Sequence, residues 1–129
     1  MPRSERSNHR VGRQGEFLAA YLLETHGIEV HHVDRQDADL WCRVGDKLVT
    51  VQVKTSGKAR VRGQRSVAPT HTFNTVQVSV DWYCFVSLTD GLLLMRPSAD
   101  VVRQCTVIKP AEFTEENQRK TIEDFIKSC

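Results

Sequence analysis

The stretch VQVKTSGKARVRGQR, residues 51–65, begins with the alternation of a β-strand and ends as a run of positive charge. Successive side chains of a strand point to opposite faces, so Val51 and Val53 share one face and Gln52 and Lys54 share the other. A strand of a small sheet therefore carries an amide beside an ammonium and leads directly into a basic segment. This polar face is the first candidate for a functional site.

The chain has 129 residues, 40% of them apolar, which is enough for one ordinary domain with a hydrophobic core. We therefore expect residues 1–129 to form a single domain. The longest apolar runs are short, such as residues 91–95, whereas a membrane helix requires about 20 apolar residues. The N-terminal segment lacks the apolar run of a secretory signal, so we expect a soluble, cytoplasmic protein that has no membrane partner.

The four cysteines are spread singly along the chain, at positions 42, 84, 105 and 129. None forms a C-x2-C pair or has a histidine at zinc-finger spacing. The pattern predicts free, partly buried thiols. We expect neither a structural zinc ion nor a small-molecule cofactor.

Charge is unevenly distributed, although the formal net charge is only +2. Residues 47–80 contain no Asp or Glu and six cations, and the first fifteen residues add four arginines against one glutamate. Acidic side chains instead gather after residue 111. Such asymmetry indicates one face for a polyanion and another for solvent.

The apolar periodicity predicts an α/β (α+β) domain with a helix first, then a hairpin-rich sheet, then a closing helix. Helical spacing runs from Val11 to Thr25, and Thr114 is a capping residue before the last helix. Strand patterns cover five segments: 28–33, 39–44, 47–55, 82–88 and 92–96.

The pairing of two of these strands follows from their turn. If Gly45 and Asp46 form a two-residue turn, paired positions sum to 91, and Asp39 stands opposite Gln52. Opposed side chains on a common face have Cβ atoms about 4.5–5.5 Å apart, and Lys54 lies two residues further along that face. Asp37, which faces Lys54 in the same register, is the next candidate after Asp39, and Asp34 is a further alternative.

A carboxylate, an amide carbonyl and an ammonium on one face suit phosphodiester hydrolysis. Asp39 and Gln52 offer two oxygen ligands to Mg²⁺, a hard cation that keeps several of its waters. Lys54 can orient an attacking water or stabilise the charge that develops on phosphorus. Thr55 and Ser56 are within reach of a phosphate at the same end of the strand.

These residues resemble the motif of the PD-(D/E)xK nuclease superfamily. The likeness rests on Asp39, on Gln52-Val53-Lys54 thirteen positions later, and on Glu16 in the helical segment GRQGEFLAAYL, residues 12–22. Within that superfamily the chain is most similar to variants with glutamine in the E-x-K position, as in group I intron-associated endonucleases, and to small archaeal Holliday-junction resolvases.

The resemblance implies a restriction-endonuclease-like core, a mixed sheet of about four strands flanked by helices. It also implies that Asp39, Gln52 and Glu16 bind Mg²⁺, or Mn²⁺ in its place, and that Lys54 assists the water nucleophile, which makes all four catalytic. In this chain Ala38 replaces the proline of the motif and Gln52 replaces a carboxylate. With less negative charge in the site, weaker affinity for Mg²⁺ is expected.

We therefore expect a Mg²⁺-dependent endonuclease that hydrolyses DNA, of the junction-resolvase or homing type, and by resemblance a homodimer. The cations expected to hold the DNA backbone are Lys58, Arg60, Arg62, Arg65 and Arg13. The alternative is a non-catalytic nucleic-acid-binding protein of the same fold. A small protein-interaction domain is a third class, which would have no affinity for DNA.

Overall fold

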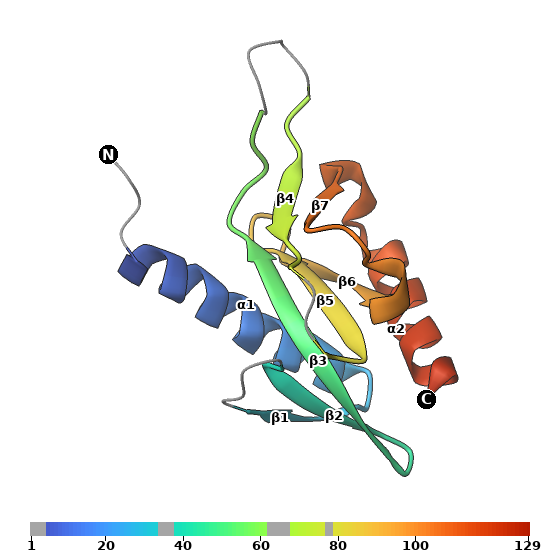
Figure 1. Cartoon of the computed structure of the whole chain (residues 1–129). Helices are drawn as coiled ribbons and strands as arrows, with labels where there is room; N and C mark the ends of the chain where they lie inside the picture. The colour runs from blue at the N-terminus through green and yellow to red at the C-terminus, as the bar shows by residue number, and fades with distance from the viewer. Residues whose placement is uncertain (1–4, 34–37, 62–67, 77–78) are drawn as a thin grey trace.

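The computed structural model describes residues 5–33, 38–61, 68–76 and 79–129. Its centre is a five-stranded mixed sheet in the order β1-β2-β3-β5-β6, in which β3 and β5 are parallel and the other neighbours antiparallel (Figure 1). The strands are β1 (Glu29–His32), β2 (Leu40–Val44), β3 (Lys47–Ser56), β5 (Trp82–Ser87) and β6 (Leu92–Pro97). The mixed sheet is as predicted, with one strand more than the four that the resemblance implied.

The hairpin between β2 and β3 has the predicted register. Val44 pairs with Lys47 and Leu40 pairs with Val51, so that paired positions sum to 91. Gly45 has a φ of +61°, in the left-handed region where glycine carries no steric cost. The turn residue thus fixes the register, and the register fixes which side chains of the two strands are neighbours.

Two helices cover one face of the sheet, α1 (Glu5–Thr25) and α2 (Glu115–Ser128). The predicted start of α1 at Val11 was wrong by six residues. The first turns extend beyond the sheet in Figure 1, so they need no apolar stripe and leave no periodic signal. Thr114 caps α2 as predicted, because its hydroxyl accepts the N–H of Asn117 at 3.1 Å.

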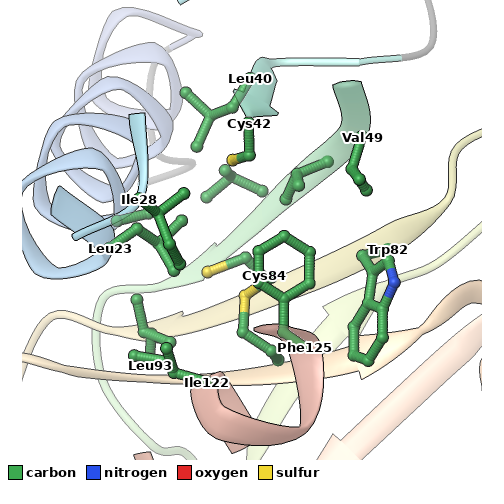
Figure 2. Close-up of a cluster of buried hydrophobic side chains, with 14 of the residues drawn as sticks. Leu23, Ile28, Leu40, Cys42, Val49, Trp82, Cys84, Leu93, Ile122 and Phe125 are labelled. Carbon is green, nitrogen blue, oxygen red and sulfur yellow. The ribbon is translucent and has the colours of Figure 1, made fainter. Parts of the chain in front are cut away.

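The helix-covered face holds the larger apolar cluster (Figure 2). Leu23 and Phe125 come from the two helices and pack on Cys42 and Cys84 of the sheet. All four cysteines are free, as predicted. Burial raises the pKa of the Cys42 thiol to about 12, which keeps it protonated and makes it a packing residue rather than a nucleophile.

The opposite face is covered by a small antiparallel sheet of β4 (His71–Asn74) and β7 (Cys105–Ile108), with the short 3-10 helices η1 (Ser98–Asp100) and η2 (Pro110–Glu112). A second apolar cluster fills the space between the two sheets, and Phe73, Phe85 and Ile108 are among its members. In the parts of the chain that the structure describes, the expected flanking helices therefore lie on one face only. No helix in those parts is long and apolar enough to span a membrane.

Candidate functional site

The predicted juxtaposition of Asp39 with β3 is present. Asp39 directly precedes β2, and its backbone N–H donates to the carbonyl of Val51 at 3.0 Å. Its Oδ2 accepts the backbone N–H of Val53 at 2.9 Å. Val53 lies between Gln52 and Lys54, so this hydrogen bond fixes the carboxylate beside both side chains.

The environment of Asp39 favours a cation nearby. Burial raises the pKa of its carboxyl, and the Val53 N–H and the Lys54 ammonium offset that effect only in part. A carboxylate has two oxygens, and Val53 engages Oδ2 alone. An additional positive charge at the other oxygen would stabilise the ionised form.

Gln52 presents a second oxygen to the same face of β3. Its Oε1 is buried and has no hydrogen-bond partner within the described parts of the chain. Leaving such an oxygen unsatisfied costs about 1–3 kcal/mol, so a ligand that coordinates it gains affinity. Oxygen donors of this kind are those that Mg²⁺ binds, and the residues present therefore fit a hard divalent cation.

Few protein side chains are available as metal ligands at this site. Among the residues that the structure describes, no three His, Cys, Asp or Glu side chains come together. The arrangement therefore supplies one carboxylate and one amide oxygen from Asp39 and Gln52, and waters or substrate oxygens would complete the shell of an ion held there.

Lys54 lies on the same face of β3 as Gln52 and also lines a cleft of about 740 Å³ at the end of β3. The cleft is bounded by Val11 and Gly12 of α1 on one side and by the segments around residues 58–61 and 70–72 on the other. Lys54, Lys58 and Arg60 line it, and no Asp or Glu is among its described lining residues. Such a cleft attracts and concentrates an anionic ligand.

Glu16 lies on α1, the helix that packs on β3 from the helix-covered face. Its neighbour Gly15 packs so closely on Thr55 that an added Cβ would overlap the threonine side chain. Alternation along β3 turns Gln52 and Lys54 to the other face. Glu16 therefore belongs to the part of α1 that packs against the end of β3, and its role as a metal ligand stays a prediction.

The described cations that follow β3, Lys58 and Arg60, lie on a chain segment that runs beside the segment leading into β4, beyond the sheet (Figure 1). Arg60 and Thr70 exchange two backbone hydrogen bonds of 2.9 Å, and the side chains of Lys58 and Arg60 are exposed at the rim of the cleft. Arg13 is exposed on α1, with its guanidinium 5.7 Å from the ring centroid of Phe17.

Some residues named in the sequence analysis lie outside the described residues. They are Arg62 and Arg65, predicted to hold DNA, and Asp34 and Asp37, the alternatives to Asp39. Their contribution stays a prediction.

Sequence reasoning missed a buried polar cluster directly behind the cleft. His71 of β4 lies 2.7 Å from the hydroxyl of Ser56, and Ser87 and Asp90 complete the cluster. These residues are up to 34 positions apart and have no recognisable spacing. The parallel pairing of β3 with β5 places Ser56 beside Ser87, and β4 adds His71 to them.

The fold is similar to that of a solved endonuclease structure. A bacterial homing endonuclease, I-Ssp6803I, superposes with a TM-score of 0.67 over 92% of this chain and 90% of that protein, at 14% sequence identity. At this identity the similarity establishes the fold alone. It confirms the predicted mixed α+β architecture.

In sequence, the chain is 37% identical over 78 residues to a protein of Anaeromyxobacter dehalogenans (strain 2CP-C) described as "UPF0102 protein". The match covers 56% of this chain and 58% of that relative, so it spans little more than half of the relative's length. No family model matches the chain.

Proposed function

We propose that this protein is a metal-dependent endonuclease that hydrolyses phosphodiester bonds of DNA. One observation carries the proposal: the carboxylate of Asp39 is fixed on the Val53 N–H, between Gln52 and Lys54, beside a cationic cleft. The homing-endonuclease fold and the PD-(D/E)xK-like spacing support the same reading.

Asp39 and Gln52 would hold Mg²⁺ or Mn²⁺, with Glu16 as a third ligand implied by the resemblance. When bound, the ion would polarise the phosphate and stabilise the charge that develops during attack. The raised pKa of Asp39 and the orphaned Gln52 Oε1 are the features of the chain that favour a cation there.

Lys54 would orient the attacking water and stabilise negative charge on the phosphoryl oxygens. In the reaction the water oxygen bonds to phosphorus and the bond to the leaving oxygen breaks. One water proton departs to solvent, and the leaving oxygen gains one. Lys58, Arg60 and Arg13 would bind the phosphates on either side, with the contributions of Arg62 and Arg65 added to theirs.

The class of substrate is DNA that presents its backbone to an open cleft, as a duplex or a four-way junction does. Because one such site cuts one strand, we propose a homodimer for cleavage of both strands. A non-catalytic DNA-binding protein is the second candidate, since the uncharged Gln52 leaves the site with less negative charge for a metal ion.

A cleavage assay separates the two candidates. Wild type, Asp39→Asn and the control Asp46→Asn, which changes an exposed aspartate in the β2–β3 turn, are each incubated with labelled duplex, single-stranded and four-way-junction DNA. Mg²⁺, Mn²⁺ or EDTA is added. Metal-dependent cutting that Asp39→Asn abolishes and Asp46→Asn retains is the expected result. DNA binding without cutting by any of the three proteins would leave the non-catalytic function.

A further inference from the structure

Behind the cleft lies a cluster of four polar residues from three different segments. Ser56 and Ser87 end the parallel strands β3 and β5 and are paired in register. His71 begins β4, and Asp90 lies in the turn between β5 and β6. The His71 side chain is only 1% exposed and Ser87 is fully buried; Ser56 is also buried, with 8% of its surface exposed, at a position that lines the cleft.

For a neutral His71 imidazole, one assignment of the protons follows from the hydrogen bond between Ser87 and Asp90. Ser87 Oγ donates to Asp90 Oδ2 at 2.7 Å, which uses its only proton. It can therefore only accept from His71 Nε2, which lies 3.3 Å away. With its proton on Nε2, the neutral imidazole leaves Nδ1 as an acceptor, and Ser56 Oγ donates to it at 2.7 Å.

The surroundings of His71 favour this neutral form. Burial lowers the pKa of the imidazole, and the Asp90 carboxylate, 3.7 Å from Nε2, opposes that effect only in part. The aromatic side chains of Phe73 and Phe113 also lie near the ring, with ring centroids 6.3 and 5.1 Å away. The acceptor at Nδ1 is thus retained near neutral pH.

The direction of these bonds determines what Ser56 can bind in the cleft. Its single proton points inward to His71, and the longer contact to the Lys58 carbonyl, at 3.2 Å, competes for the same proton. Toward the cleft the hydroxyl oxygen can only accept a hydrogen bond. A phosphate oxygen offers no proton, so the partner of Ser56 must be a donor such as water.

Lys54 and Ser56 are two residues apart on β3, so both point to the same face, about 6.6 Å apart along the strand. One water can bridge an ammonium and a hydroxyl over such a spacing. Both residues line the same cleft. A water held between them is positioned by Lys54 on one side and by a pure acceptor on the other.

We propose that Ser56 is a further catalytic residue, which accepts a hydrogen bond from the water that attacks phosphorus, and that His71 is the positioning residue that turns the Ser56 proton away from the cleft. This inference rests on the proposed endonuclease activity. Ser56 takes no proton in the step. By accepting a hydrogen bond from the water, Ser56 orients a lone pair of the water oxygen toward phosphorus.

The test compares three variants in single-turnover cleavage of labelled duplex and four-way-junction DNA with Mg²⁺. Ser56→Ala and His71→Phe are expected to slow cleavage about 10- to 100-fold, the cost of a misplaced nucleophile. The Kd for DNA should stay within about twofold. His71→Asn, whose amide oxygen can replace Nδ1 as acceptor, should restore most of the rate. Ser128→Ala, on α2 away from the cleft, is the control and should cleave like wild type.

A second readout does not depend on cleavage. Imidazole ¹⁵N NMR of the wild-type protein should report His71 with its proton on Nε2, and Ser56→Ala should shift the Nδ1 resonance. If His71→Phe fails to fold, Ser56→Ala decides the cleavage test alone.

Two outcomes would overturn the inference while the proposed function stands: a His71 proton on Nδ1, or metal-dependent cleavage by Ser56→Ala at the wild-type rate. Absence of cleavage by wild type with every metal and substrate would overturn the endonuclease proposal, and the inference with it.

Discussion

The two faces of the central sheet are built from the same strands but differ in chemistry. On the helix-covered face, β3 contributes Val49, Val51 and Val53 to a cluster that is apolar throughout. On the face covered by β4 and β7, the intervening residues of β3 are polar: Gln52, Lys54 and Ser56. Alternate residues of one strand thus face the apolar core and the polar candidate site. A substitution on the first face is expected to change stability, and one on the second face is expected to change cleavage.

The substitution with the largest expected effect lies in the apolar core on the helix-covered face. Phe125 of α2 is fully buried and packs edge-on against Trp82, with ring centroids 5.0 Å apart. Phe125→Ala should lower the free energy of unfolding by about 3–5 kcal/mol through lost burial and the cavity left behind. Urea unfolding measures this, with the neighbouring, more exposed Ile126→Ala as control, which should cost less. Equal losses for both variants would contradict the assignment of this face to the core.

The next largest effect is expected from a substitution on the polar face of β3. Lys54→Ala should reduce single-turnover cleavage about 100- to 1000-fold, the usual cost of removing one group that stabilises charge in the transition state. DNA affinity should change little. Lys47→Ala is the matched control, because Lys47 lies at the other end of the same strand and is exposed. Wild-type turnover by Lys54→Ala would remove this residue from the mechanism.

A smaller effect is expected at the rim of the cleft. If Lys58 and Arg60 each neutralise one DNA phosphate, Lys58→Ala and Arg60→Ala should each reduce the slope of log K against log salt by about 0.9 for duplex DNA. Arg119→Ala, an exposed cation of α2 paired with Glu123, should leave the slope unchanged. Binding titrations at several salt concentrations measure these slopes. An unchanged slope in both variants would show that the DNA backbone does not bind at the rim of this cleft.

The smallest effect concerns the pH dependence of stability. Because burial lowers the pKa of His71 in the folded protein, the unfolded chain binds a proton first as pH falls below about 6.5. The free energy of unfolding therefore falls as the pH decreases, and His71 accounts for less than about 1.4 kcal/mol of this fall per pH unit. His71→Asn should flatten the fall in stability between pH 7 and 5, as seen in urea unfolding. An identical pH profile for the variant would show that His71 is protonated equally in both states.

Much of the candidate site could be read from local sequence. The Gly45-Asp46 turn fixes the hairpin register, and the period of two puts Gln52 and Lys54 on one face. The opposition of Asp39 to Gln52 follows from those two facts. The hydrogen bond from Val53 to Asp39 does not, because it depends on where β2 begins.

Sequence by itself determined the five strands of the large sheet, the turn, the Thr114 cap and the acid-free basic segment, since each depends on residues close together in the chain. Tertiary structure alone decided that both helices share one face, that α1 meets β3 at Gly15, and that a small sheet covers the other face. It also assembled Ser56 and His71 into one cluster. These contacts join residues far apart in sequence, and which of the sterically allowed pairings occurs is settled by burial and by hydrogen bonding within the folded core.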